Sequence, residues 1–285
     1  MSDAQPLWLL VNSQSGSFSQ TAVDEVSETF SNSGTPVARH IVFPDEHLPT
    51  PRQLADAGVA VLAVFTGDGT LNSALAQLHG WTGTVLVLPG GTMNLLSKRL
   101  HGPDAESGEI IRRWAEGAGR AVRPQVVRCA LGDAYASLLV GPGTAWANVR
   151  EAMRDFDIPA LAQETTSAIA ETAGGTMVAC TDPDRGRPEG YPLIELTPSH
   201  RGMQVDGYHS EKPGEYVQQG FALLRRRFRD GPHCRLGLLD EITIASVAGE
   251  AIPVLIDGEA REIASPARFA VAESEIDLLA THHGY

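Results

Sequence analysis

Two glycine-rich segments carry residue types that suit phosphate chemistry. They are Thr66-Gly67-Asp68-Gly69-Thr70 and Pro89-Gly90-Gly91-Thr92-Met93-Asn94. Glycine lets the backbone approach an anion closely, and successive N–H groups at the start of a helix point toward it. One such segment alone would be interpreted as an ordinary turn, but two in tandem favour a nucleotide-binding site. Asp68 does not suit a bare anion site, so we expect its carboxylate to contact magnesium, a hydroxyl proton or a ribose hydroxyl.

The elements around these segments predict a parallel sheet. Each segment follows an apolar run typical of a buried strand, residues 59–65 and 84–88, and each leads into a stretch with helical spacing. Similar runs alternate up to about residue 121, which indicates βαβ units and a doubly wound α/β sheet. Ligands bind at the carboxyl ends of such strands, where both glycine segments lie.

The second half of the chain has a different texture. Short β-type runs are separated by turn-rich stretches, and Gly132-Asp133 is expected to form a hairpin turn. A helix is expected at about residues 215–229. We therefore predict an α/β nucleotide-binding domain over residues 1–122 and a β-rich domain over residues 123–285.

Two further motifs extend the pattern to a family resemblance. Asn12-Ser13-Gln14-Ser15-Gly16 follows the first apolar run, and Asp257-Gly258-Glu259 lies near the C-terminus. With the two glycine segments, these motifs resemble the catalytic domain of diacylglycerol kinases and sphingosine kinases, especially soluble bacterial lipid kinases. The family has an Asn-Pro-x-x-Gly turn and an Asp-Gly-Glu motif in the same order. The resemblance implies a doubly wound α/β nucleotide domain followed by a β-sandwich-like domain that takes the lipid substrate.

The resemblance also implies an activity, which is transfer of the γ-phosphate of ATP, with Mg²⁺, to a hydroxyl of a lipid alcohol such as diacylglycerol or a sphingoid base. Such kinases position the phosphate, neutralise its charge with magnesium and place a hydroxyl in line. Asp68 would bind or orient the nucleotide and its metal, and Asp257, supported by Glu259, would deprotonate the acceptor. Taken alone, Asp257-Gly258 would be a plain turn after a strand. The residues expected to bind the nucleotide are Asn12, Gly16, Thr66, Gly67, Gly69, Thr70, Gly90, Gly91, Thr92 and Asn94.

The chain departs from the family pattern at three places. Thr66 replaces the usual first Gly of the Gly-Gly-Asp-Gly-Thr motif, Ser13 replaces the usual Pro, and Leu95 stands where many members have Asp. That Asp belongs to a magnesium-linked polar network in some members. Leu95 therefore keeps open a non-catalytic nucleotide- or lipid-binding homologue. A phosphotransferase similar to NAD kinase also stays open, because such enzymes share a Gly-Gly-Asp-Gly motif. A dehydrogenase is disfavoured because no Gly-x-Gly-x-x-Gly follows the first strand.

Composition limits the partners. The net charge of −13 argues against binding to nucleic acid, and the absence of Gly-Lys-Ser/Thr excludes a P-loop mechanism. A lipid acceptor would require transient contact with a membrane surface. The cluster Arg225-Arg226-Arg227-Phe228-Arg229 either contacts anionic head groups or forms a solvated helix end.

The same composition bears on localisation. The three cysteines are odd in number and far apart, so we expect reduced thiols in a cytoplasmic protein. No apolar run approaches the ~20 residues of a membrane span, and the N-terminus lacks the basic region of a signal peptide. The expected localisation is cytoplasmic with peripheral membrane contact. The sequence does not set the oligomeric state.

Overall fold

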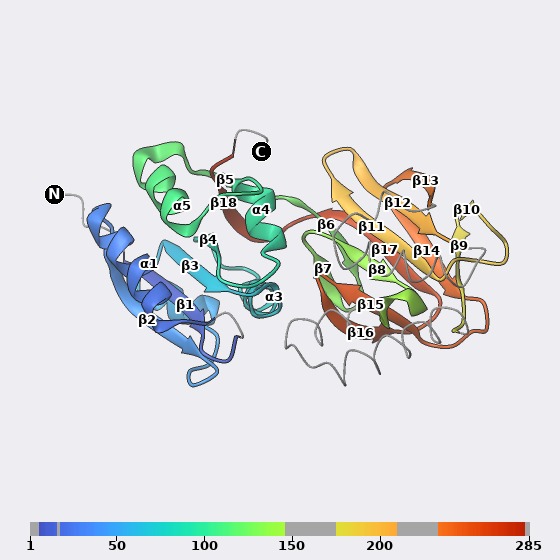
Figure 1. The fold of residues 1–285 in the computed structure, drawn as a ribbon, viewed down its shortest axis with the longest axis horizontal. Coiled ribbons are helices and arrows are strands. Elements are labelled where there is room, and N and C mark those ends of the chain that lie inside the picture. Colours follow the sequence, from blue (N-terminus) through green and yellow to red (C-terminus); the bar gives the residue numbers. More distant parts are fainter. Residues whose placement is uncertain (1–5, 16–17, 146–174, 210–232, 283–285) are drawn as a thin grey trace. The chain divides into compact units, whose positions relative to one another are not determined.

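A computed structural model describes residues 6–15, 18–145, 175–209 and 233–282 of the chain (Figure 1). The chain divides into two compact units. Unit 1 contains Met1–Pro124 and Glu273–Tyr285, and unit 2 contains Gln125–Ala272. Each unit is described by itself.

Unit 1 is built on a six-stranded sheet with strand order β2-β1-β3-β4-β18-β5. The first five strands in this order run parallel, and β5 is antiparallel to β18. The central strands are nearly continuous apolar runs, as expected for strands covered on both faces. The strands are β1 (Leu7–Asn12), β2 (Val37–Phe43), β3 (Val61–Thr66), β4 (Thr84–Pro89), β5 (Arg120–Val122) and β18 (Asp277–Ala280).

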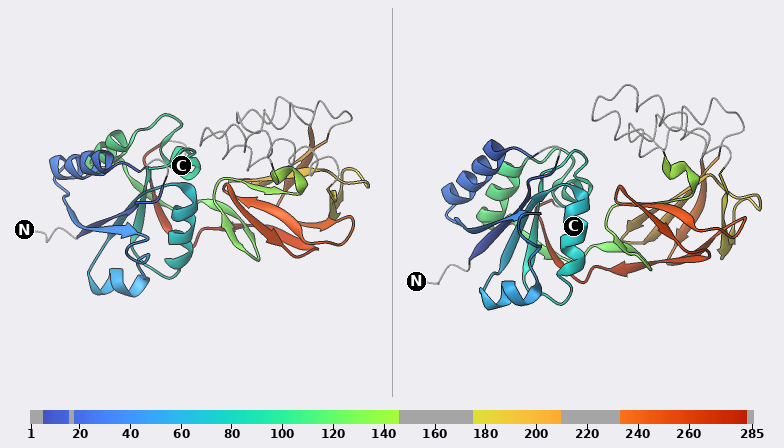
Figure 2. Two further views of the ribbon diagram at one scale, coloured as in Figure 1. Left: turned by 60° about the horizontal axis from the view of Figure 1, so that its bottom comes forward. Right: turned by 90° about the horizontal axis from the view of Figure 1, so that it is seen from below.

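Helices cover the sheet of unit 1, and Figure 2 shows α1 and α5 on one face with α2 on the other. Local sequence explains two of the helix starts. Ser19 accepts a bond from the Ala22 N–H to cap α1, and Thr50 with Gln53 forms a capping box at α2, with a proline in the first turn. The helices are α1 (Gln20–Asn32), α2 (Pro51–Asp56), α3 (Asp68–Gln77), α4 (Leu95–His101), α5 (Ser107–Arg113) and a π-helical turn, η1 (Trp114–Ala118).

Unit 2 contains two six-stranded sheets, ordered β10-β9-β14-β17-β6-β7 and β13-β12-β11-β8-β15-β16. Residues from both sheets, including Phe269, Ile244, Ile194 and Val205, share one apolar core. The elements are β6 (Gln125–Cys129), β7 (Gly132–Ala134), β8 (Leu138–Val140), the 3-10 turn η2 (Pro142–Ala145), β9 (Val178–Asp182), β10 (Asp184–Arg185), β11 (Leu193–Ser199), β12 (Gly202–Tyr208), β13 (His233–Leu239), β14 (Glu241–Ser246), β15 (Ile252–Ile256), β16 (Glu259–Ile263) and β17 (Ala267–Glu273).

The expected change from an α/β fold to a β-rich fold is therefore observed, but the expected boundaries differ in one respect. Residues 273–285 were placed with the second domain, whereas they belong to unit 1. The reason is that β18 pairs parallel with β4 and antiparallel with β5, so the chain returns to complete the first sheet. The hairpin turn expected at Gly132-Asp133 was also misplaced, because Cys129 pairs with Gly132 and the turn lies between them.

Some sequence predictions lie outside the described residues. These are the helix at 215–229, the basic cluster 225–229 and Gly16. None of the helices in the described part of the chain has the length and apolar character needed to cross a membrane.

Candidate functional site

Three polar turns meet at the carboxyl ends of neighbouring parallel strands in unit 1. They follow β1, β3 and β4, and the strand register places Val11 beside Phe65 and Thr66 beside Pro89. Most of the residues predicted to bind nucleotide are therefore brought together at one edge of one sheet. This edge is where open α/β sheets bind ligands.

The two glycine turns pack against each other, backbone to backbone. A Cβ added at Gly91 would lie 2.6 Å from the Cα of Gly67, and one added at Gly90 would lie 2.5 Å from the Thr66 nitrogen. Neither position has room for a side chain, because the atoms it would meet are backbone atoms. The sequence assigned these glycines to anion approach, and the structure adds a packing reason for Gly90 and Gly91.

Gly67 differs from the other two. Its φ of −75° and ψ of 166° are open to any residue, and an added Cβ would lie 3.9 Å from the Cα of Gly91, an ordinary contact. Gly67 is the N-cap of α3 and provides no side-chain cap for the first-turn N–H groups. The positive end of the α3 dipole and these N–H groups therefore suit an anion beside Gly67.

Asp68 is the first residue of α3 and connects the two glycine turns. Its Oδ1 accepts the N–H of Leu95, the first residue of α4, at 2.9 Å. The carboxylate thus stabilises the start of the helix that follows the second turn. One carboxylate is also a usual protein contribution to magnesium held mainly by phosphates and water, so Asp68 fits both a positioning role and a metal contact.

Asn94 closes the second glycine turn with its side chain. Its Oδ1 accepts the Gly91 N–H at 2.8 Å, and its Nδ2 donates to the Gly91 carbonyl at 2.7 Å. The backbone of Asn94 is left-handed, with φ of 51°. Among the residues that the structure describes, Asn94 and Asp257 are the two non-glycine residues with positive φ. Both belong to the predicted motifs, and Asn and Asp tolerate this conformation better than most residues.

Asn12 joins the first turn to α3. Its Nδ2 donates to Thr70 Oγ1 at 2.7 Å, while its Oδ1 accepts the Gln14 N–H at 2.9 Å. Hydrogen bonds therefore link the three turns in a row. The Asn12–Thr70 bond joins the turn after β1 to the turn after β3, and the Asp68–Leu95 bond joins the turn after β3 to the turn after β4.

Three other residues predicted to bind nucleotide differ in where they lie. Gly69 lies in the first turn of α3, and Thr92 is exposed at the second turn. Thr66 is buried, so its side chain supports the turn rather than facing solvent.

Asp257 lies in unit 2, where its carboxylate holds a loop. It is 4% exposed and accepts three backbone N–H groups, from Tyr135 at 2.7 Å, Ala136 at 2.7 Å and Ser137 at 2.8 Å. With Gly258, whose φ is also positive, it forms the two-residue turn of the β15–β16 hairpin, the turn type that favours Asp-Gly. The structure thus shows the plain turn that Asp257-Gly258 alone indicated. A general base must offer a lone pair to the acceptor hydroxyl. The three N–H groups already occupy most of the lone pairs of the Asp257 carboxylate.

Glu259, the predicted supporting acid, begins β16 and is exposed. Its backbone pairs with Ile256 on the neighbouring strand. Its role stays a prediction.

His101 is a residue that the sequence did not single out. It ends α4, is 1% exposed, and its Nδ1 lies 2.9 Å from the Thr281 hydroxyl, while no partner for its Nε2 is found in the described part of the chain. The pKa of His101 is lowered to about 4, chiefly because burial disfavours the charged ring, with a smaller contribution in the same direction from the nearby Arg113 cation. The Val87 carbonyl opposes this by favouring the protonated ring, but it makes no hydrogen bond of ordinary geometry to Nε2. No local sequence signal indicated the role of His101, because its partner Thr281 lies 180 positions away in the chain.

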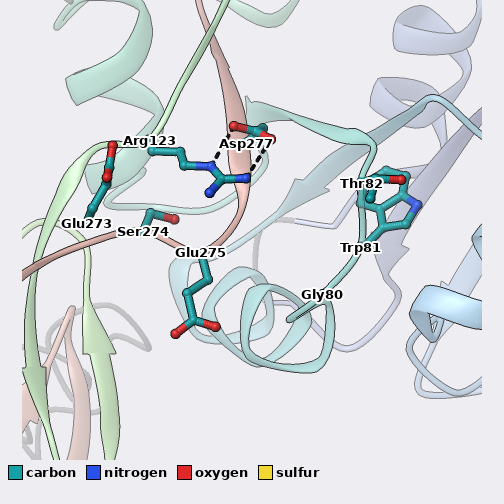
Figure 3. A pocket seen from close by; sticks show the side chains of 8 residues that line it. All are labelled: Gly80, Trp81, Thr82, Arg123, Glu273, Ser274, Glu275 and Asp277. Atoms are coloured by element: carbon teal, nitrogen blue, oxygen red, sulfur yellow. Dashed lines mark hydrogen bonds and ion pairs between the residues drawn. The ribbon is translucent and has the colours of Figure 1, made fainter.

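Figure 3 shows a cavity of about 580 Å³. Its lining includes residues just before β4 and at the start of β18, so it lies at the opposite end of these strands from the glycine turns. Arg123 reaches Asp277 there through two bonds of 2.9 and 3.1 Å. Glu273 and Glu275 also line it. With three carboxylates against one guanidinium, this cavity does not suit a phosphate.

The described residues contain no group of three or more His, Cys, Asp or Glu side chains that could hold a metal ion. Within these residues, a magnesium ion would fit as a companion of nucleotide phosphates, with Asp68 as the carboxylate in the turns. This matches the usual preference of Mg²⁺ for phosphate and water with few carboxylates.

Comparisons with known proteins bear most directly on unit 1. Residues 6–126 match the family model for the diacylglycerol kinase catalytic domain, so the resemblance drawn from the motifs is confirmed over this stretch. A crystal structure described as a diacylglycerol kinase from Bacillus anthracis str. Sterne is 13% identical, with a TM-score of 0.62 and coverage of 98% of each chain. A second structure from the same organism is 14% identical, with a TM-score of 0.64 and coverage of 97% of this chain and 95% of that one. At these identities the likeness shows a shared fold. No curated protein gives a significant match.

Proposed function

From the diacylglycerol kinase catalytic domain matched by residues 6–126, we infer that this protein is an ATP- and Mg²⁺-dependent lipid kinase. It transfers the γ-phosphate to a hydroxyl of a lipid alcohol, such as diacylglycerol or a sphingoid base. The single structural observation that supports this proposal is the set of hydrogen-bonded turns after β1, β3 and β4, with the start of α3, which has no side-chain cap, beside them.

Each part of the turn set has a role in phosphoryl transfer, which depends mainly on positioning and charge stabilisation. The first-turn N–H groups of α3 bind phosphate oxygens, and the packed glycines hold the two turns in place. Asp68 orients the second turn through the Leu95 N–H and contacts the metal that accompanies the nucleotide. When bound, magnesium supplies charge neutralisation on the transferring phosphate.

The proton of the acceptor hydroxyl needs an acceptor group. Asp257, with Glu259 in support, remains the family-derived assignment for this base. The three N–H groups on Asp257 make its loop-holding role the stronger of its two roles.

A second candidate function is nucleotide binding without turnover. The observation that favours it is that two of the three predicted catalytic acids accept backbone N–H groups, Asp68 from Leu95 and Asp257 from three residues. The replacement of the family's Asp by Leu95 points the same way.

A transfer assay separates the candidates. Purified protein is incubated with Mg²⁺ and γ-³²P-ATP, together with diacylglycerol, monoacylglycerol or sphingosine in mixed micelles, or with NAD. Labelled lipid supports the proposal, and labelled NAD supports the NAD-kinase alternative. ATP binding with no labelled product from any acceptor supports the non-catalytic alternative. Asp68→Asn serves as the matched variant, because an amide oxygen can still accept the Leu95 N–H.

Membrane contact follows from the proposal, since these lipid acceptors reside in bilayers. The net charge of −13 opposes general attraction to anionic membranes. Docking would therefore depend on a local basic patch, for which residues 225–229 are the sequence candidate.

A further inference from the structure

The C-terminal segment of the chain closes on the helix that leaves the second glycine turn. This helix, α4, has seven residues and begins directly after Asn94. Isolated helices shorter than about 12 residues are marginal in water, so the position of α4 depends on tertiary contacts, which include the buried side chains of Leu96 and Leu100 and the bonds at its two ends. At its first residue, Leu95, the N–H is held by Asp68.

The other end of α4 is held by Thr281 and His282. Both of their N–H groups donate to the Leu100 carbonyl, at 3.2 Å each. The Thr281 hydroxyl lies 2.9 Å from His101 Nδ1. Carbonyl groups at a helix end lack partners within the helix, so the returning segment supplies them. Leu100, His101 and Thr281 are all buried, which protects these bonds from competing water.

The same segment also contacts the strand that enters the turn. Thr281 directly follows β18, whose Asp277 and Leu278 pair with Thr84 and Val85 of β4. β4 leads into the second glycine turn, and α4 leads out of it. One C-terminal segment therefore touches both elements that fix the position of this turn.

We propose that Thr281 and His101 are positioning residues for the second glycine turn, because their contact fixes where α4 lies. A seven-residue helix is about 10 Å long, and close-packed elements move as units. A shift at His101 is therefore carried to Leu95 and to the Gly91–Asn94 bonds. What the turn binds rests on the proposed function, but the positioning itself does not.

The test substitution is Thr281→Val, which removes the hydroxyl at constant shape. Amide hydrogen exchange followed by NMR reads the turn directly, since the N–H groups of Gly91 and Leu95 are hydrogen-bonded at 2.8 and 2.9 Å. Exchange at these two amides should accelerate about five- to tenfold, the effect of losing one typical hydrogen bond. The Leu71 amide, which starts the α3 ladder by donating to Gly67 at 3.1 Å, should keep its rate.

Two control variants sharpen this test. Thr281→Ser retains the hydroxyl and should restore wild-type exchange. Thr84→Val removes a threonine hydroxyl at the far end of β4, where it donates to the Ala60 carbonyl at 3.4 Å, and should leave Gly91 and Leu95 unaffected. Unchanged exchange in Thr281→Val, or equal acceleration at Leu71, would overturn the proposal, because the latter would indicate a general loss of stability.

A binding titration connects the inference to nucleotide. If the wild type binds ATP, Thr281→Val should raise the Kd for ATP to the extent that it lowers the fraction of molecules with the turn in place, and Thr281→Ser should restore the wild-type Kd. A wild type that binds no ATP would refute the proposed function, and the exchange rates would still decide whether Thr281 positions the turn.

Discussion

The buried imidazole of His101 makes the stability of unit 1 depend on pH in a defined window. Its pKa is about 4 in the folded protein, against an ordinary value of 6.5, chiefly because burial disfavours the charged ring. The unfolded chain therefore binds more protons between these values. The stabilisation from the neutral ring is fully present above pH 6.5 and is lost as the pH falls toward 4.

The magnitude follows from the size of the shift. A lowering of about 2.5 pKa units corresponds to about 3 kcal/mol over the whole window. Between pH 7.5 and pH 5, about 2 kcal/mol of this should be lost, a large part of a typical stability of 5–15 kcal/mol. Protonation would place a cation in a buried site that faces Arg113, the Thr281 hydroxyl and the Val87 carbonyl, with His282 on the adjoining segment.

Urea unfolding at both pH values measures this effect, with tryptophan fluorescence as the probe. The matched variant is His101→Asn, because its amide can still bond the Thr281 hydroxyl but does not titrate. Other titrating groups contribute equally to both proteins, so the difference between their pH dependences isolates His101. The wild type should lose about 2 kcal/mol more than the variant. Equal losses in the two proteins would refute the assignment of a buried, neutral imidazole.

Three further substitutions test the turns and the Asp257 loop. Gly91→Ala should lower the free energy of unfolding by about 1–3 kcal/mol in urea titration, because its Cβ would lie 2.6 Å from the Gly67 Cα; unchanged stability would refute the packing of the turns. Asp68→Asn should lower kcat by orders of magnitude with little change in Tm, and wild-type turnover would remove this carboxylate from the chemistry. Asp257→Asn should lower stability by about 2–3 kcal/mol, since an amide cannot replace a carboxylate that accepts three N–H groups. Lost turnover at unchanged Tm would instead favour the base assignment.

The sequence predicted the location of the two glycine turns because this information is local. Glycine, Asp and Asn directly after apolar runs mark strand ends in an α/β sheet. The contacts between the turns were not predictable in the same way. Asn12 bonds Thr70, 58 positions away, and Asp68 bonds Leu95, 27 positions away. Such pairings depend on strand order and register, which a single sequence does not encode locally.

The misassigned C-terminus and the missed His101 have one cause. β18 is a four-residue strand whose partners, β4 and β5, lie far earlier in the chain. No periodicity in so short a run indicates which sheet it joins. For Asp257, by contrast, local sequence was informative, because it indicated the turn that the structure contains. The family motif did not indicate that three N–H groups bind the carboxylate.

The most direct test of nucleotide binding by the turns is ATP affinity in a matched pair of variants at Gly67. Asp and Asn are both good N-cap residues, and an added Cβ fits at this position, so both variants should keep the wild-type Tm. The two side chains differ only in charge. At about 5 Å and an effective dielectric of about 20, a carboxylate repels a phosphate charge by about 3 kcal/mol.

Isothermal titration with Mg²⁺ and ATP should therefore show saturable binding to the wild type. Gly67→Asn should bind more weakly, and Gly67→Asp should bind more weakly again, by a further factor of about 100. Equal ATP affinity in the Asp and Asn variants would contradict the account, because it would mean that no phosphate lies beside Gly67.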